Sequence, residues 1–203
     1  MSMSGNRARL YVLILLAIIS SVCWAEVDPF WLRSWEQAQI NRPAVMQSNG
    51  RIAAPDEPGI PFVIHGQVFK PDGRTPASDV VVHSYHRDSQ GFDFGPDENN
   101  YPVWRLQGWV KTDSKGYFRF QTIRPAPDHL GREGAHIHFT LETKEHGKQW
   151  APTVYFFDDP LVKKDRIEES KRNGEFGAVR NVEIGEDVQY IEVKIKIKEK
   201  PDF

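Results

Sequence analysis

The chain has 203 residues, a formal net charge of −2 at pH 7 and a single cysteine. This near-neutral balance argues against a nucleic-acid partner, because there is no basic excess with which to displace counterions from phosphates. The length suits one domain with a hydrophobic core.

The first 25 residues, MSMSGNRARLYVLILLAIISSVCWA, have the pattern of an export signal. Arg7 and Arg9 give a positive start, residues 10–19 form a short apolar run, and small side chains precede a cleavage point after Ala25. The apolar run is short for a membrane span. The sequence therefore predicts an exported protein, periplasmic or extracellular, with no membrane attachment once residues 1–25 are removed.

The single cysteine, Cys23, lies inside this segment. Cleavage would leave a chain without disulfides in a compartment that permits them, so that its core or a metal must hold the fold. Two alternatives remain open for the segment. Cys23 could be the lipidated residue of a lipoprotein, although Val22 in front of it is larger than that motif requires, or the apolar run could stay as an uncleaved anchor.

The next elements are a short helix and a linker. Residues 28–43, DPFWLRSWEQAQINRP, begin with a proline and space their apolar side chains as a helix lying on a domain would. The following stretch, MQSNGRIAAPDEPGIP, is rich in glycine, proline and polar residues and predicts a loop. We assign residues 26–59 to this helix and linker, and residues 60–203 to one domain.

That domain reads as a series of short strands separated by turns. The predicted strands are residues 62–70, 79–88, 104–113, 117–123, 135–142, 152–157 and 188–198. The last of them alternates perfectly between aliphatic and charged side chains, and the charged stretch 158–177 has room for one or two helical turns. The pattern predicts an all-β fold, a sandwich of about seven to nine short antiparallel strands, with a short N-terminal helix.

One of these strands carries two histidines on the same face. In AHIHFTL, residues 135–141, the apolar side chains point one way while His136 and His138 point the other. Their backbones lie about 6–7 Å apart, because a strand rises about 3.3 Å per residue. The two rings can therefore converge on one metal ion. From the spacing alone, a metal site is no more favoured than two solvated histidines on the outer face of a sheet.

Several segments match, in order, the motifs of one family. The first is a strand, a turn and a second strand that ends in a W/Y-x-x-D-x-x-G pattern, in HGQVFKPDGRTPASDVVVHSYHRDSQG. The second is a hairpin that resembles TD-x-x-G-x-Y-x-F-x-T-I-x-P, in KTDSKGYFRFQTIRP. The last two are the strands HIHF and TVYFFDDP. In this order, over roughly residues 60–160, the chain resembles the intradiol ring-cleavage dioxygenases, the family of catechol and protocatechuate dioxygenases. The DG-x-P turn and the hairpin motif are also shared by prealbumin-like binding modules without enzyme activity.

The resemblance implies a ferric iron site held by two tyrosines and two histidines, of which only the histidines are present. They correspond to His136 and His138. The first tyrosine, two residues after the glycine of the first segment, is replaced by Asp93. The second, in T-I-x-P-x-x-Y, is replaced by Asp128.

Two further active-site positions of the family also differ. The arginine three residues before the first histidine is replaced by Glu133, with Arg132 beside it, and the glutamine of T-Q-x-Y-F is replaced by Thr153. By resemblance, Arg132 is assigned to stabilise substrate charge. Asp128 is assigned as a base in addition to its ligand role.

Two histidines and two aspartates form a competent ligand set, since carboxylate is a hard anionic oxygen donor like phenolate. The resemblance implies Fe(III), and the exchange of tyrosine for aspartate admits Fe(II), Mn, Zn or Cu. The competing interpretation is that Asp93 and Asp128 are ordinary loop residues, a common context for aspartate. Further donors near the matched segments are Tyr101, His86 and His129.

The function implied is the O2-dependent cleavage of an aromatic 1,2-diol between its hydroxyl-bearing carbons. The partners would be a small aromatic diol and O2, with a homodimer as a further possibility. Two alternatives stay open: a diverged exported member that binds a metal or small ligand without cleaving rings, and a prealbumin-like interaction module without a metal.

Overall fold

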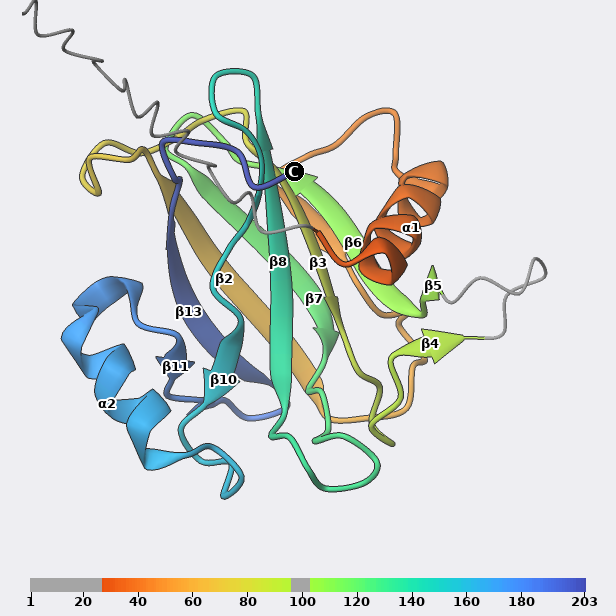
Figure 1. The fold of residues 1–203 in the computed structure, drawn as a ribbon. Helices are drawn as coiled ribbons and strands as arrows, with labels where there is room; N and C mark the ends of the chain where they lie inside the picture. The colour runs from red at the N-terminus through yellow and green to blue at the C-terminus, as the bar shows by residue number, and fades with distance from the viewer. Residues whose placement is uncertain (1–26, 96–102) are drawn as a thin grey trace, which may run out of the picture.

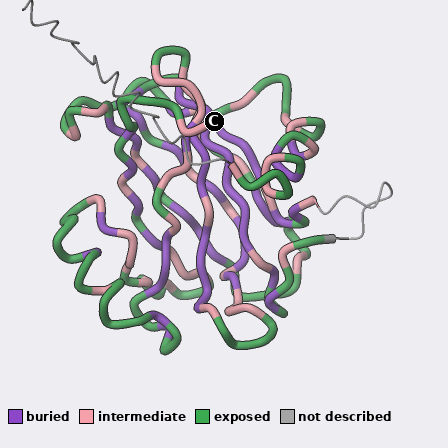
Figure 2. Tube along the Cα trace, viewed as in Figure 1, coloured by how far each residue is buried: buried purple, intermediate pink, exposed green. Residues whose placement is uncertain are grey.

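The computed structural model describes residues 27–95 and 103–203, and the chain there folds into two facing β-sheets flanked by two helices (Figure 1). The predicted export segment and Tyr101 lie outside the described residues. Buried residues run along the strands between the two layers (Figure 2). The expected all-β sandwich with a short N-terminal helix is thereby confirmed.

The first sheet has five strands in the order β1-β7-β2-β13-β12. These are β1 (Asn49–Arg51), β7 (Tyr117–Ile123), β2 (Pro61–Phe69), β13 (Gln189–Lys196) and β12 (Glu183–Ile184). The second sheet has six strands, ordered β11-β10-β8-β3-β6 with β9 paired to β8. These are β11 (Val179–Arg180), β10 (Val154–Phe156), β8 (His136–Thr143), β3 (Val81–His86), β6 (Leu106–Lys111) and β9 (Gly147–Trp150).

The remaining elements are short. They are the hairpin of β4 (Phe94–Gly95) and β5 (Val103–Trp104), the helices α1 (Pro29–Ala38) and α2 (Lys164–Arg172), and the 3₁₀ turns η1 (Gln39–Asn41) and η2 (Gly174–Phe176). Neither helix of the described residues has the length and apolar character that a membrane crossing needs.

The main core is made by the alternating residues of the facing strands. Ile137 and Phe139 of β8 point inward, as do Ile191 and Val193 of β13, and all four are almost fully buried. Each such side chain contributes about 1.5–3 kcal/mol through removal of its apolar surface from water. The opposite side chains of β8 are thereby fixed on the outer face of the six-stranded sheet.

Helix α1 covers part of that outer face. Asp28 caps the helix by accepting the N–H of Phe30, and a proline at the first turn fixes its start. One helical face then packs Trp35 and Ala38 against Tyr85 and its neighbours on the sheet. Because Trp35 and Ala38 of α1 pack against Val81 and Tyr85, β3 is buried on both of its faces, and the helix lies to one side of β8 and β10 (Figure 1).

The pairing differs from expectation in three places. β13 runs parallel to β2, β1 runs parallel to β7, and β10 runs parallel to β11. Hydrophobic alternation shows which side of a strand is buried but carries no information about its direction. In addition, the expected linker contains strand β1, where Gly50 lies so close to Val110 that a Cβ would meet its side chain at 2.6 Å.

Truncation at the core should be costly, and a matched pair of isoleucines tests this. Ile191 of β13 is fully buried, whereas Ile184 of β12 is 79% exposed. We expect Ile191→Ala to lower the free energy of unfolding by about 2–5 kcal/mol, and Ile184→Ala to change it by less than about 0.5 kcal/mol. Urea denaturation of both variants measures the difference. Equal effects would contradict the assignment of the core.

A buried histidine beneath α1 should make stability depend on pH. Burial lowers the pKa of His83 from 6.5 to about 4, and the ring stacks on Trp109 at 4.5 Å. The unfolded chain therefore binds a proton at higher pH than the folded one, so that stability is complete above pH 6.5 and falls toward pH 4 by about 1.4 kcal/mol per unit. His83→Phe should remove this contribution, so that the slope in denaturation curves measured from pH 6.5 to 4 falls by about 1.4 kcal/mol per pH unit, while the buried His86 and His138 keep theirs. An unchanged slope would refute the prediction.

Candidate functional site

Two rows of side chains cross the outer face of the six-stranded sheet, with the histidines in the middle. Strand β8 supplies His136 and His138. In the strand pairing, His138 lies opposite Tyr85 of β3, and His136 lies opposite Tyr155 of β10. The rings are in contact across the strands, with centroids 4.8 Å apart for Tyr85 and His138 and 5.2 Å apart for His136 and Tyr155.

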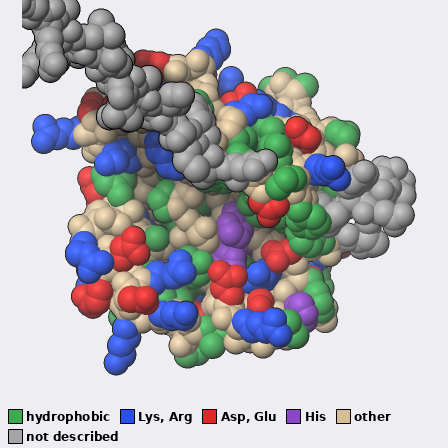
Figure 3. Space-filling model, viewed as in Figure 1, with side chains coloured by type: hydrophobic (Ala, Val, Ile, Leu, Met, Phe, Trp, Pro, Cys, Tyr) green, Lys and Arg blue, Asp and Glu red, His purple; other side chains and the backbone are tan. Residues whose placement is uncertain are grey.

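Two more residues complete the rows. The pairing of β3 with β8 ends with His86 opposite Ile137, and one further step along the same register places Arg87 beside His136. On the other side of β8, the hydroxyl of Thr153 lies 3.3 Å from Nδ1 of His138. We call these six residues the histidine grid: Tyr85, His138 and Thr153 in one row, and Arg87, His136 and Tyr155 in the other. Figure 3 shows histidine at the centre of this face, with hydrophobic side chains toward α1 and charged ones below.

The histidine rings converge through their Nε2 atoms. These atoms are 2.9 Å apart, and the ring planes are perpendicular. The Nδ1 atom of His136 lies 2.8 Å from the carbonyl oxygen of Gly134. That bond requires a hydrogen on Nδ1, so in the neutral ring Nε2 of His136 carries a free lone pair.

This arrangement fits two adjacent ligands of one metal ion. With metal–nitrogen distances of about 2.0–2.1 Å, two nitrogens 2.9 Å apart subtend an angle of about 90° at the ion. A second-sphere hydrogen bond such as the one from His136 to Gly134 is usual for a metal-binding histidine. The pKa of His138 is lowered from 6.5 to about 3, mainly by burial and in smaller part by the neighbouring His136 and Arg87. His138 is therefore neutral, as a ligand must be.

Asp93 does not join the histidine pair. Its Oδ2 accepts the Nε–H of Arg87 at 3.0 Å. The Nη2 of the same guanidinium donates to Oε2 of Glu133 at 3.4 Å, and the hydroxyl of Tyr155 donates to Oε1 of Glu133 at 3.2 Å. Arg87 thus forms ion pairs with both Asp93 and Glu133 at the edge of the grid.

Asp128 is engaged in its own loop. Its Oδ1 accepts the backbone N–H groups of Arg132 and Leu130 at 2.8 and 3.0 Å. These bonds, led by the one from Arg132, lower the pKa of the Asp128 carboxyl and make it a weaker base. Arg132 is itself exposed on this loop. The structure thus shows the loop arrangement that was the competing interpretation of Asp128.

The expected ligand set is therefore brought together only in its histidines. Within residues 27–95 and 103–203, no group of three or more His, Cys, Asp or Glu side chains is placed to hold an ion. His86 is buried inside the sandwich with its two ring nitrogens 2.7 Å from the Arg87 carbonyl and the Thr122 hydroxyl. His129 stacks on Phe92. The metal roles of Asp93 and Asp128 remain predictions.

Sequence reasoning overlooked Arg87 and Tyr155. Both could have been found from strand alternation, since Arg87 is two residues beyond Tyr85 and shares its face. The aromatic part of the grid continues under α1, where Tyr85 stacks on Trp104 at 3.8 Å and accepts the Nε1–H of Trp31 at 2.8 Å. The helix therefore supports the ring that lies against His138.

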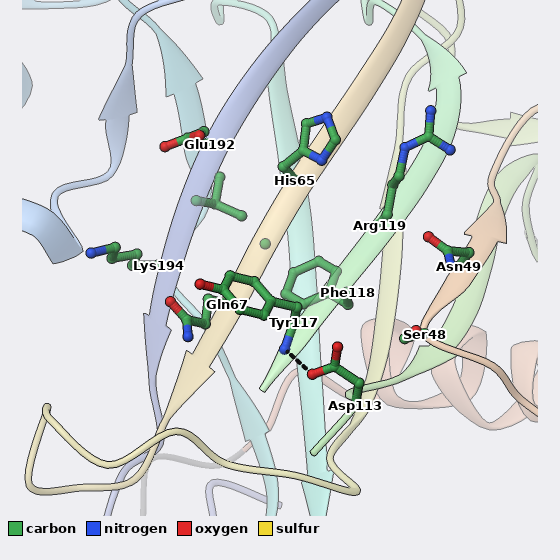
Figure 4. A pocket seen from close by; sticks show the side chains of 12 residues that line it. Ser48, Asn49, His65, Gln67, Asp113, Tyr117, Phe118, Arg119, Glu192 and Lys194 are labelled. Carbon is green, nitrogen blue, oxygen red and sulfur yellow. Dashed lines mark hydrogen bonds between the residues drawn. The ribbon is translucent and has the colours of Figure 1, made fainter. Parts of the chain in front are cut away.

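A hollow lies on the other layer of the sandwich. It has a volume of about 440 Å³ and lies on the outer face of the five-stranded sheet, lined by residues that include His65, Arg119 and Glu192 (Figure 4). The backbone N–H of Tyr117 donates to Asp113 at its rim. The core separates this hollow from the histidine grid, so it is not part of the candidate site.

The loops below the grid are held together at Gly91. Its backbone has φ +87°, and its carbonyl accepts the N–H of His129 in the second loop. A Cβ at Gly91 would lie 2.3 Å from the Pro127 carbonyl oxygen, whereas one at Gly131, with φ +65°, would meet nothing within 4 Å.

Alanine substitutions at the two glycines therefore distinguish the effect of backbone strain from that of steric contact. Gly131→Ala should lower the unfolding free energy by about 1–2 kcal/mol through left-handed strain alone. Gly91→Ala should lower it further, because the two loops must also move apart. Chemical denaturation of both variants measures this. A Gly91 variant no less stable than the Gly131 variant would show that the loops are not closely packed there.

Comparison with known proteins agrees with the fold. A family model described as Dioxygenase matches residues 35–198. Catechol 1,2-dioxygenase 1 of Acinetobacter lwoffii is 33% identical over 129 residues, which cover 55% of this chain and 40% of that protein. Catechol 1,2-dioxygenase of Acinetobacter baylyi is 29% identical over 127 residues, 51% of this chain and 40% of that protein.

Solved structures show the same fold at lower identity. The 3-chlorocatechol 1,2-dioxygenase of Rhodococcus opacus superposes with a TM-score of 0.57 and 17% identity, over 77% of this chain and 67% of that one. An intradiol ring-cleavage dioxygenase of Tetranychus urticae superposes with a TM-score of 0.56 and 17% identity, over 77% of this chain and 89% of that one.

The matched regions span 40% of the length of each of these two Acinetobacter catechol dioxygenases. The family model nevertheless extends over most of the chain, from α1 to the end of β13, and the sandwich and the His-x-His strand lie within it. The chain belongs to the intradiol ring-cleavage dioxygenase family.

Proposed function

We propose that this protein is an exported non-heme metal dioxygenase that uses O2 to cleave an aromatic 1,2-diol between its hydroxyl-bearing carbons. The observation that carries the proposal is the convergence of the His136 and His138 Nε2 atoms, 2.9 Å apart, on the fold of this family. Export, to the periplasm or outside the cell, is proposed from the signal pattern of residues 1–25.

His136 and His138 would hold the ion, for which the family favours iron. The bound ion would supply the chemistry that activates the diol and O2 toward each other. The carboxylate of Glu133 lies near the histidines, with Oε1 4.0 Å from Nδ1 of His136, and would favour a cation there. The hydroxyl groups of Tyr85 and Tyr155 are engaged with Trp31 and Glu133, respectively. An iron form without tyrosine ligands would lack the red colour that phenolates give the family.

The other grid residues suit a flat aromatic ligand. Tyr85 is held between His138 and Trp104, with both rings nearly parallel to its own, and so forms a rigid aromatic wall toward α1. On the opposite side, Tyr155 is fixed by its bond to Glu133 and by the guanidinium of Arg166, 3.9 Å from the ring centroid. A planar diol placed over the histidines would lie above imidazoles that these two rings hold in position.

The first test is the metal content of the protein purified without chelators or a His tag. Wild type should carry close to one equivalent of iron, and His136→Ala/His138→Ala should lose it. The double variant His65→Ala/His146→Ala, which changes two histidines away from the grid, should retain it. Equal metal in the two double variants would refute the site.

The second test is oxygen consumption. Wild type supplied with catechol should take up one O2 per diol and form a muconate-type diacid, and the His136/His138 variant should lose at least 100-fold in rate. Tightly bound metal without O2 uptake across a panel of diols would overturn ring cleavage and leave a metal-binding member of the family.

A further inference from the structure

We propose that the hollow on the outer face of the five-stranded sheet is a binding site for an acidic saccharide, a sugar that carries hydroxyl groups and a carboxylate. The hollow has a volume of about 440 Å³, which is within the usual range of small-molecule pockets. It lies across the core from the histidine grid, so the inference does not depend on the proposed function.

The strand pairing sets the side chains of this hollow in two rows. Each row takes one residue from β7, one from β2 and one from β13: Arg119, His65 and Glu192 in the first, and Tyr117, Gln67 and Lys194 in the second. Residues two apart on a strand share a face, so both rows stand on the outer face of the sheet. Neighbouring strands are about 4.8 Å apart, so the backbones at the two ends of a row are separated by about 9–10 Å.

The first observation is that Arg119 lacks an acceptor. Within residues 27–95 and 103–203, the half-buried arginines are Arg42, Arg87, Arg119, Arg124 and Arg180. Each of the others donates to a carboxylate or a carbonyl oxygen, whereas the guanidinium of Arg119 has no hydrogen-bond or ion-pair acceptor among these residues. Its planar fork of N–H groups matches the two oxygens of a carboxylate. This end of the first row therefore suits an anionic group of a ligand.

The second observation is that the other groups of the hollow call for hydrogen-bond donors on the ligand. Glu192 is exposed at the far end of the first row, and its carboxylate accepts hydrogen bonds only. Gln67 uses its Nε2 on the carbonyl of Lys115 at 3.0 Å, which leaves its Oε1 as an acceptor. The ammonium of Lys194 is paired with Glu175 at 2.7 Å. A ligand that fits both ends of the row thus has a carboxylate at one end and donors, such as hydroxyl groups, at the other.

The third observation is an exposed aromatic ring among these polar groups. Tyr117 is 48% exposed, and its ring extends across β2 toward Gln67 (Figure 4). Its backbone is fixed by the bond from its N–H to Asp113 at 2.9 Å. An aromatic ring offers a flat apolar surface. The C–H side of a sugar ring can pack on that surface while the hydroxyl groups at its edge reach the polar side chains, which is the combination that an acidic saccharide requires.

The experiment compares D-galacturonate with D-galactose, which differ only by a carboxylate in place of a hydroxymethyl group. Dissociation constants are measured at neutral pH, by calorimetry or NMR titration, on the protein as purified. Wild type should bind galacturonate at least 10-fold more tightly than galactose. Arg119→Met should lose this preference, Arg119→Lys should keep part of it, and Tyr117→Ala should weaken the binding of both sugars at least threefold. Arg74→Met, which changes an exposed arginine in the turn after β2, should behave as wild type.

Three results would overturn the inference: no preference in wild type, a preference retained by Arg119→Met, or acetate bound as tightly as galacturonate, which would make the hollow a simple anion site. Circular dichroism shows whether each variant is folded. If Arg119→Met is not, Arg119→Lys decides the question, because it keeps the charge and removes the fork.

Catechol supplies the remaining control, because the adjacent hydroxyl groups of a sugar are also able to bind a metal. A saturating concentration of catechol should leave the affinity for galacturonate unchanged, since the core lies between the hollow and the histidine grid. Displacement of galacturonate by catechol would assign the sugar to the grid and refute a separate site. Sugar binding without ring cleavage, or cleavage without sugar binding, tells the failure of one proposal from the failure of the other.

Discussion

The pairing of β8 with β3 on one side and β10 on the other is the constraint on which the rest of the site depends. It sets Tyr85 against His138 and Tyr155 against His136, so that each histidine has an aromatic neighbour from a different strand. A slip of one residue in this pairing would turn the histidines into the core and Ile137 and Phe139 into water. The register is therefore secured by the burial of those two apolar side chains, and the same hydrophobic layer that stabilises the sandwich also aims the imidazoles.

The alternation of apolar and polar side chains and the order of the motifs predicted the sandwich and its N-terminal helix. The same alternation predicted that His136 and His138 point away from the core. The partners of Asp93 did not, because its contact with Arg87 joins a strand end to a loop whose path no local pattern specifies. The same holds for Glu133, which pairs across strands with Arg87. The direction of the strands could not be predicted from the sequence either. The chain between β2 and β13 is long enough for β13 to run parallel or antiparallel to β2.

The charged residues around the histidines form a system different from the one that the family resemblance implies. Asp93 and Asp128, which the resemblance sets at the positions of the two tyrosines, have different partners in this chain: Asp93 pairs with Arg87, and Asp128 closes a loop through backbone N–H groups. Glu133, just before β8, also pairs with Arg87. The guanidinium at the end of β3 thus holds the carboxylates of two separate segments beside the two imidazoles.

The position of β13 in the five-stranded sheet has a consequence for when the protein can fold. This strand is the last one along the sequence, yet it pairs with β2 and carries fully buried side chains such as Ile191 and Val193 into the centre of the core. A chain that emerges from its N-terminus therefore cannot complete its hydrophobic layer until its final segment has been made. Such late, long-range closure slows folding. Under the proposed export, this delay would keep the chain extended long enough to be threaded through a membrane channel before it collapses.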